Sequence, residues 1–248
     1  GGEPDALIVA FDKQTGEELW RAVEVVGEMG YGQPVIFEAG GARQLVVWHA
    51  AALVSLNPET GETFWEEEWE VGAGMSVTTP VKSGDYLLVS QFYNGSLMMR
   101  LNQDRPAATM LWKGSSRSEM PNETEGLHSL ITTPLIIGDY IYGVDSYGEL
   151  RGLDAKNGER LWVSDQMTAQ ARWGAAFLVK HEDRYFVNND DGFLMIAQFT
   201  PEGYIELDRT KLIEPNGTAG LGDGRFDRPI NWSHPAYANQ HIVHRNNT

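Results

Sequence analysis

The chain has 248 residues, of which 42% are hydrophobic and 22% are charged, a composition typical of a globular protein. Its formal net charge of −16, with no cluster of basic residues to offset it, disfavours nucleic acids and anionic membrane surfaces as partners. The absence of cysteine excludes disulfides and thiolate chemistry, and no apolar run approaches the ~18 residues that a membrane span requires.

A ten-residue pattern that ends on tryptophan recurs along the chain. It reads FDKQTGEELW in its first copy, LNPETGETFW in its second and LDAKNGERLW in its fourth; the third and fifth are degenerate. The copies lie at residues 11–20, 56–65, 101–112, 153–162 and 199–207. Their last residues are 45, 47, 50 and 45 positions apart, and a fixed period in this range indicates one supersecondary unit per repeat.

Each copy follows the same series of short strand signals. A short apolar run, in most copies preceded by proline, recurs at residues 33–37, 79–83, 133–137, 174–179 and 234–238. Within residues 133–162, this run leads through a Gly-Asp turn, a second strand, a Ser-Tyr-Gly turn and a third strand to the tryptophan pattern. Four short strands in each ~45 residues, without a helix-period segment, predict an all-β protein, a β-propeller of four-stranded antiparallel blades.

The repeated pattern is expected to be the hairpin between the third and fourth strands of a blade. Its first polar side chain starts the turn, and its glycine occupies a position that requires positive φ. The tryptophan is a large apolar side chain whose N–H needs a partner, and we expect it to pack between blades. The residues of this structural motif are Asp12, Asn57, Asp154, Gly16, Gly61, Gly158, Gly203, Trp20, Trp65, Trp112 and Trp162.

The repeats resemble those of pyrroloquinoline-quinone-type (PQQ-like) propellers. The shared signature is D-x-x-T/N-G-E-x-L/F-W, preceded by an x-P-V/L strand and a G-D-Y-I/L turn, and it covers essentially the whole chain. The order of segments, including TPEGYIEL at 200–207 and SHPAYANQHIVHRN at 233–246, is most similar to uncharacterised exported bacterial members. The group includes quinoprotein dehydrogenases and also non-enzymatic propellers, among them an outer-membrane assembly lipoprotein, so the resemblance alone does not assign a function.

The chain is expected to form one propeller domain over residues 1–248, with four complete blades between two half blades. The complete blades cover residues 31–71, 76–113, 128–165 and 172–214, and the half blades cover residues 1–26 and 230–248. The resembling propellers usually have seven or eight blades, so we favour a portion of a larger ring. The alternative is a closed five-bladed ring in which the two half blades form one shared blade.

Segments that enter the innermost strands are expected to converge on the central channel. Polar groups beside aromatic rings at a concave mouth suit a ligand site. Such polar side chains also routinely form hydrogen bonds with the backbone groups of loops, and we favour this structural role. The alternative is a small-molecule site. The candidate residues for that site are Tyr31, His128, Arg172, Trp173, Trp232 and His234.

Two other segments carry residue types found in ligand sites. NNDDG at 188–192 offers oxygen ligands for calcium, but its position between two strands favours a solvated turn over a metal site. The glycine-rich segment at 217–228 is not followed by a helix, so we expect an insertion rather than a phosphate-binding loop. No histidine spacing matches a known metal motif, and we predict neither a metal site nor catalytic residues.

We favour a non-catalytic propeller that scaffolds or binds a protein or carbohydrate partner and needs no cofactor. The alternative, carried by the resemblance alone, is a PQQ- and calcium-dependent dehydrogenase or a degenerate relative of one. The resemblance also implies a periplasmic or secreted protein. The first residues, GGEPDALIV, lack the basic start and apolar core of a signal peptide, which would then have been removed or lie in a longer chain.

Overall fold

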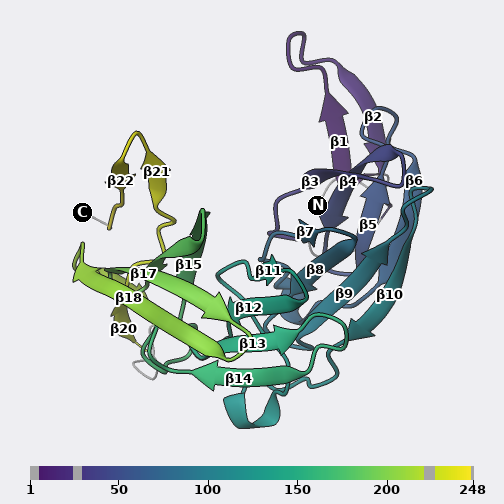
Figure 1. Ribbon diagram of the computed structural model, residues 1–248. Helices are drawn as coiled ribbons and strands as arrows, with labels where there is room; N and C mark the ends of the chain where they lie inside the picture. The colour runs from purple at the N-terminus through teal and green to yellow at the C-terminus, as the bar shows by residue number, and fades with distance from the viewer. Residues whose placement is uncertain (1–5, 25–29, 221–226, 247–248) are drawn as a thin grey trace.

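The computed structural model describes residues 6–24, 30–220 and 227–246. It is almost entirely β-structure, in four four-stranded antiparallel sheets and three two-stranded ones. The four-stranded sheets follow one another along an arc, with the hairpins β1–β2 and β21–β22 at its two ends (Figure 1). The predicted all-β propeller architecture of four-stranded blades is therefore confirmed.

Each four-stranded sheet is a meander in which consecutive strands pair. The first contains β3 (Val35–Ala39), β4 (Ala42–Trp48), β5 (Ala52–Leu56) and β6 (Thr63–Glu68). The second contains β7 (Val81–Ser83), β8 (Tyr86–Ser90), β9 (Ser96–Leu101) and β10 (Ala108–Lys113). The third contains β11 (Leu135–Ile137), β12 (Tyr140–Val144), β13 (Leu150–Asp154) and β14 (Arg160–Ser164). The fourth contains β15 (Ala176–His181), β16 (Arg184–Asn189), β17 (Phe193–Thr200) and β18 (Gly203–Lys211).

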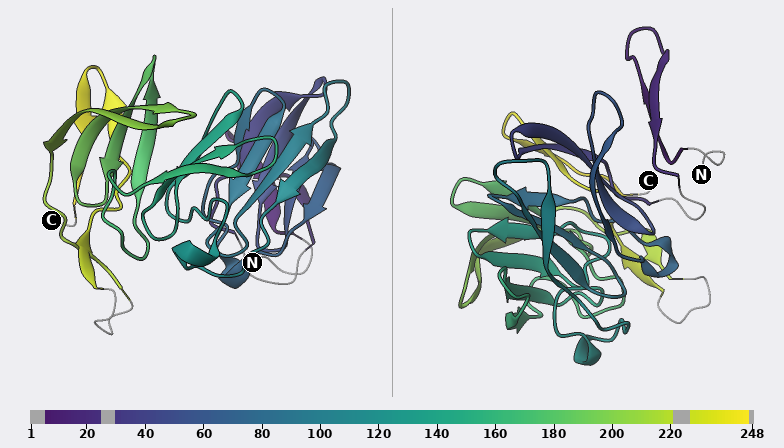
Figure 2. Two further views of the ribbon diagram at one scale, coloured as in Figure 1. Left: turned by 60° about the horizontal axis from the view of Figure 1, so that its bottom comes forward. Right: turned by 90° about the vertical axis from the view of Figure 1, so that its right-hand side faces the viewer.

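The smaller elements lie at the ends of the arc and on one side of it. The two-stranded sheets are β1 (Ile8–Phe11) with β2 (Glu18–Ala22), β19 (Gly217–Ala219) with β20 (Arg228–Ile230), and β21 (Ala236–Ala238) with β22 (His241–Val243). Two short 3-10 turns are η1 (Gly72–Gly74) and η2 (Pro121–Glu123). In the left view of Figure 2, η2 and the β19–β20 hairpin project from the same side of the sheets.

The hairpins β1–β2 and β21–β22 are separate sheets with no pairing between them. Figure 1 shows the arc open between these two ends. Among the described residues, the shared blade of the five-bladed alternative is therefore not formed. The number of blades in the intact protein stays a prediction.

The hydrophobic core is divided among the spaces between neighbouring sheets. Trp48 and Leu53 of the first sheet pack with Leu87 and Met99 of the second. The second and third sheets share a similar cluster, as do the third and fourth. Because inner strands are covered on both faces, β5 and β8 are buried at every position instead of alternating between buried and exposed.

The repeated turns have a common backbone geometry in three copies. The Asp12 carboxylate accepts the backbone N–H groups of Gln14 and Thr15, each at 2.8 Å, which closes the first of these turns. Gly16, Gly61 and Gly158 adopt φ values of 75°, 76° and 75°, the left-handed region that glycine tolerates best.

The fifth turn does not follow this geometry. Gly203 has φ of 159°, far from the 75–76° of the other three glycines, so the left-handed turn geometry expected for it is wrong. The reason is loop length: Thr200 pairs directly with Gly203, which leaves a two-residue hairpin of Pro201 and Glu202. A loop of this length places the glycine inside the strand ladder, where a left-handed residue is not required.

Three of the four tryptophans of the repeated pattern connect their own sheet to the next one. The indole N–H of Trp20 donates to the Pro58 carbonyl at 3.2 Å. The indole N–H of Trp112 donates to the Ala155 carbonyl at 2.8 Å, and Trp162 makes the same kind of bond to the fourth sheet. Trp65 differs, because its N–H bonds to Gln44 in its own sheet at 2.8 Å.

Two of the turn glycines also make room for a tryptophan from the preceding sheet. A Cβ atom added to Gly61 would lie 2.6 Å from a ring carbon of Trp20, and one on Gly158 would lie 2.8 Å from Trp112. Gly16, which has the same φ, has open space at that position. At Gly61 and Gly158 the glycine therefore serves both the turn and the contact between sheets.

Candidate functional site

The channel mouth brings together two of the candidate ligand-binding residues. Tyr31 and His234 line a cavity of about 490 Å³ together with Gln33, Thr132 and Phe177. The rings of His234 and Phe177 meet edge-on, with their centroids 4.9 Å apart. The described residues that line this cavity offer hydroxyl, amide and imidazole groups, and none of them carries a carboxylate. Ligand binding here stays a prediction.

His128 is buried between the second and third four-stranded sheets, away from this cavity. Its Nδ1 lies 3.0 Å from the Phe92 carbonyl oxygen, and because a carbonyl only accepts, Nδ1 carries the hydrogen. Burial lowers the pKa of His128 to about 4, so the ring is neutral at pH 7. His128 therefore acts as an internal tie between the two sheets.

Arg172 and Trp173 lie together in the segment before β15. The Arg172 guanidinium is 4.5 Å from the centroid of the Trp173 ring and 5.5 Å from that of Phe92. Trp173 has φ of 63°, which is uncommon for a bulky residue. Trp232 lines neither this region nor the channel mouth, and within the described residues its buried Nε1 has no hydrogen-bond partner. The structure thus does not gather the candidates into one site.

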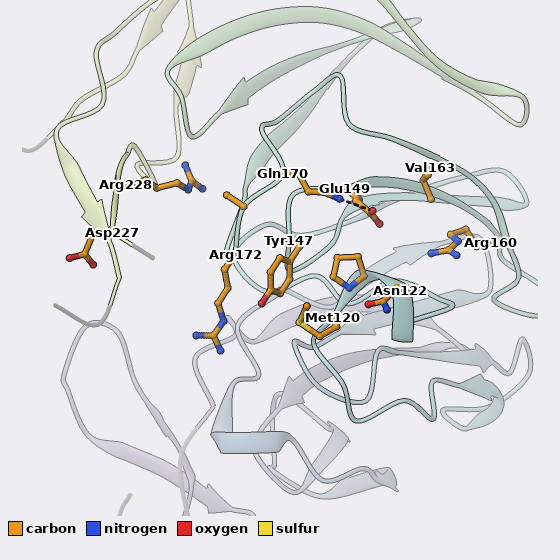
Figure 3. Close-up of a pocket in the computed structure, with 12 residues that line it drawn as sticks. Met120, Asn122, Tyr147, Glu149, Arg160, Val163, Gln170, Arg172, Asp227 and Arg228 are labelled. Atoms are coloured by element: carbon orange, nitrogen blue, oxygen red, sulfur yellow. Dashed lines mark hydrogen bonds between the residues drawn. The ribbon is translucent and has the colours of Figure 1, made fainter. Parts of the chain in front are cut away.

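A larger cavity, of about 820 Å³, opens on the side of the sheets that carries η2 (Figure 3). Its walls come from η2, the turn between β12 and β13, strand β14, the segment before β15 and the start of β20. The lining residues are Met120, Pro121, Asn122, Tyr147, Glu149, Arg160, Val163, Gln170, Ala171, Arg172, Asp227 and Arg228. Of the residues proposed from sequence, only Arg172 lies here.

One fully buried arginine holds the segment that contains η2, residues 119–126 (the η2 segment), beside this cavity. Arg151, on β13, has no solvent-exposed side-chain surface. Its Nη1 donates to the Gly126 carbonyl at 2.7 Å, and to the Thr124 carbonyl at 3.2 Å and hydroxyl at 2.9 Å. Its Nη2 reaches the Pro121 carbonyl at 3.3 Å. A single guanidinium therefore fixes the backbone of residues 121–126.

The charge of Arg151 is balanced by two carboxylates. Its Nη2 lies 2.8 Å from Asp145 and 2.7 Å from Glu149. Burial raises the pKa of Asp145, although Arg151 acts in the opposite direction. Glu149 accepts hydrogen bonds from Arg151, and Asp145 Oδ1 accepts the backbone N–H groups of Tyr147 and Glu149 at 2.9 and 3.2 Å, whereas Asp145 Oδ2 meets Arg151 as an ion pair only. A buried ionic group held by several such contacts fixes one local conformation.

Arg151 is not among the residues predicted from sequence, although the repeat contains a signal for it. Three positions before the turn residue Asp154, Arg151 occupies the place that Val54 and Met99 hold in the first two sheets. Both of those side chains are apolar and buried. A charged residue at a buried position of the repeat predicts a partner outside the repeat, which here is the η2 segment.

A second clamp connects the η2 segment to the fourth sheet. Glu119 accepts the Arg172 guanidinium at 2.5 Å and the Tyr147 hydroxyl at 3.3 Å. The Ser146 hydroxyl bonds to the Glu119 carbonyl at 3.3 Å. Residues 119–126 are therefore held at both ends, and the cavity beside them is preformed.

The turn at residues 190–192 carries a third connection, and its environment corrects an expectation. The turn lies between β16 and β17, but it is not solvated: Asn188, Asn189 and Asp190 are at most 3% exposed. The Asp190 carboxylate pairs with Arg228 of β20 and accepts the Ala175 N–H at 3.0 Å. Burial raises the pKa of Asp190. This carboxylate therefore anchors the β19–β20 hairpin.

Part of the glycine-rich segment that precedes β20, residues 221–226, lies outside the described residues. In the part of the chain that is described, no group of three or more histidine, aspartate and glutamate side chains is placed to hold a metal ion. No helix there is long and apolar enough to cross a membrane.

Comparison with known proteins places these features in a family. The chain is 22% identical to the outer membrane protein assembly factor BamB of Yersinia pestis, over 88% of its own length and 67% of that protein. It is 26% identical to the BamB of Burkholderia pseudomallei, over 67% of its length and 42% of that protein. The chain thus spans two thirds of one relative and less than half of the other.

Two solved structures share the fold at low sequence identity. A europium-containing methanol dehydrogenase aligns with a TM-score of 0.52 at 13% identity, over 90% of this chain and 50% of that one. The β-propeller domain of Cps50 (Swd1) from Myceliophteria thermophila aligns with a TM-score of 0.53 at 10% identity, over 85% and 66%. The family model described as outer membrane protein assembly factor BamB matches residues 4–170, which is more than half of the chain. The chain therefore belongs to the BamB family of PQQ-like propellers.

Proposed function

We propose that this chain is a non-catalytic propeller that binds a protein partner in the assembly of outer membrane proteins, in the periplasm. The family is described as an outer membrane protein assembly factor, which supports a role in that assembly, and the propeller fold supports a scaffold. The observation that carries the proposal is the cavity beside η2, which is built from non-repeated segments and held in shape by the Arg151 and Glu119 clamps.

The side chains around this cavity are of the types that dominate protein interfaces. Methionine, tyrosine and arginine are enriched at interface centres, and Met120, Tyr147 and Arg172 supply one of each. A preformed cavity lowers the entropy that association costs, because few groups must be ordered when the partner arrives. Both features favour a protein partner at this face.

The alternative of a quinone–calcium pair has weaker physical support. Calcium binds six to eight oxygen ligands, usually with carboxylates among them. Among the described residues, the cavity around Tyr31 and His234 is lined by no carboxylate, and the buried carboxylate of Asp190 is already paired with Arg228. These residues do not fit a calcium-bound quinone, and we propose no chemistry that depends on one.

The proposed function is tested by deleting the gene in its source organism and measuring outer membrane protein abundance by quantitative mass spectrometry. We expect abundance to fall and the wild-type gene to restore it. Met120 and Met110 are matched for complementation, because they are 42% and 39% exposed and only Met120 lines the cavity. Met120→Glu is expected to fail and Met110→Glu to succeed. Unchanged abundance in the deletion strain would rule out the assembly role.

A further inference from the structure

One end of the η2 cavity carries the positive charge of Arg160, which also lines a neighbouring cavity with Glu125 and Glu159 but forms an ion pair with neither. Arg160, at the start of β14, is exposed and lines this cavity. Its Nη1 donates to the Thr124 carbonyl at 3.2 Å, which holds the guanidinium at the rim. Within the described residues it forms no ion pair, in a chain where 35 acidic residues face 19 basic ones.

The other charges of the cavity are occupied or lie at its far end. Arg172 is paired with Glu119, and Arg228 is paired with Asp190. Figure 3 shows Asp227 at the opposite end of the cavity from Arg160.

Glu149 is the acidic residue of the wall on the Arg160 side. One of its oxygens pairs with Arg151 at 2.7 Å, and the other accepts Gln170 at 3.2 Å. Its charge is therefore balanced from within the molecule. Arg160 is the charged group of this end that an incoming ligand can pair with.

Two exposed apolar side chains line the cavity together with Arg160. Met120 is 42% exposed and Val163 is 51% exposed, and both line the cavity. Figure 3 shows Val163 and Arg160 on the same side of it. Burying the exposed methyl groups of Met120 and Val163 removes apolar surface from water, which is favourable. A ligand that covers these groups and also pairs with Arg160 would gain from both contacts.

We propose that this end of the cavity binds a segment of a partner protein in which a carboxylate side chain lies next to an aromatic or aliphatic one. The carboxylate pairs with Arg160, and the apolar side chain packs against Met120 and Val163. This inference rests on the proposed function in that the occupant is a protein. The planar guanidinium donates two parallel hydrogen bonds to the two oxygens of a carboxylate, which selects for a carboxylate over an amide.

The experiment uses two peptides that differ only in charge, acetyl-Gly-Phe-Asp-Gly-amide and acetyl-Gly-Phe-Asn-Gly-amide. Each is titrated into the full chain while the methyl NMR signals of Met120 and Val163 are followed. We expect the acidic peptide to shift both signals with a dissociation constant of about 1 mM. The amide peptide is expected to bind about tenfold more weakly. Equal affinities, or no shift with either peptide, would overturn the proposal.

Two arginine variants provide the matched comparison. Arg160→Gln should reduce the affinity for the acidic peptide to that of the amide peptide. Arg184→Gln should leave it unchanged, because Arg184 is exposed on β16 and lies outside the cavity. An undiminished affinity in Arg160→Gln would exclude Arg160 as the carboxylate site. The peptide titration and the gene deletion can fail separately, so the ligand chemistry and the assembly role are tested apart.

Discussion

The repeated turns and the single η2 segment stabilise the molecule by different physical means. At a repeated turn, a tryptophan from one sheet lies on a glycine of the next and donates one hydrogen bond to its backbone, as Trp112 does with Gly158 and Ala155. At the η2 segment, one buried guanidinium holds several carbonyl groups and two carboxylates. The first device is apolar and distributed over the sheets, whereas the second is ionic and concentrated in Arg151.

This difference predicts where the molecule is sensitive. Several turn contacts share the connection between sheets, so the loss of one leaves the others in place. The η2 segment has no second copy, and its anchor is a buried charge whose removal leaves other charges uncompensated. Mutation should therefore act more strongly on the η2 region than on the turns.

The largest effect is expected from Arg151→Met. Removing the guanidinium leaves Asp145 buried without its counter-charge, which should lower the free energy of unfolding by about 3–5 kcal/mol. Denaturant unfolding measures the change. Arg43→Met is the control, because the Arg43–Glu59 pair is exposed and should contribute less than about 1 kcal/mol. Similar losses in both variants would contradict a special role for Arg151.

The next effect is a dependence of stability on pH through His128. Its pKa is lowered from 6.5 to about 4 in the folded state, so the unfolded chain binds a proton more readily between these values. Its contribution is fully present above pH 6.5 and is lost as the pH falls to 4, with a total of about 3 kcal/mol.

His128→Gln should remove this contribution, so its unfolding free energy should vary less between pH 7 and pH 4 than that of the wild type. His49 and His244 have pKa values lowered by burial and act in the same direction. Asp145 and Asp190 have raised pKa values and act in the opposite one, so only the difference between the two proteins is informative. Identical pH profiles would contradict the burial of a neutral His128.

The turns themselves can be compared through three glycines of equal φ. Gly16→Ala places a Cβ in open space and should cost about 1 kcal/mol from backbone strain alone. Gly61→Ala and Gly158→Ala also displace a tryptophan ring and should cost about 2–4 kcal/mol. Thermal unfolding at matched conditions distinguishes them. If all three variants melt together, the glycine does not make room for the tryptophan.

The smallest effect concerns the tryptophan that does not bond to the next sheet. Trp112→Phe leaves the Ala155 carbonyl without the indole donor, and should cost about 1–2 kcal/mol. Trp65→Phe should cost less, because the Gln44 oxygen still accepts the Ser55 hydroxyl at 2.9 Å. Unfolding of the two variants in urea provides the comparison, and a larger loss for Trp65→Phe would reverse our interpretation.

The sequence predicts those parts of the molecule that are repeated. The period of the tryptophan turns and the proline-led strands indicates four-stranded blades, because identical local geometry requires the same residue types each time. The partner of each tryptophan cannot be predicted from sequence. The contact between Trp20 and Gly61, for example, joins two repeats whose relative placement depends on the packing of whole sheets. Equally, Gly203 retains the glycine of the motif but not its loop length.

The cavity could not be predicted, because its walls come from segments that occur once. Arg151 meets Thr124 and Gly126 across a stretch with no counterpart in the other repeats. Its only signal is the charge at a position that is apolar in two other sheets. The candidate residues at the channel mouth share only their position before an innermost strand. Position in the repeat does not fix where a loop side chain points, and the structure places His128 and Arg172 in other cavities than Tyr31 and His234.

The central claim is that the Arg151 clamp, and not the repeated turns, shapes the binding face. The most direct test is the affinity of Arg151→Lys for the acidic peptide, measured by NMR titration beside Gly61→Ala. Lysine keeps the charge but cannot hold the Thr124, Gly126 and Pro121 carbonyls in one planar fork. We predict about a tenfold loss of affinity in Arg151→Lys and wild-type affinity in Gly61→Ala. Wild-type affinity in Arg151→Lys would contradict the claim.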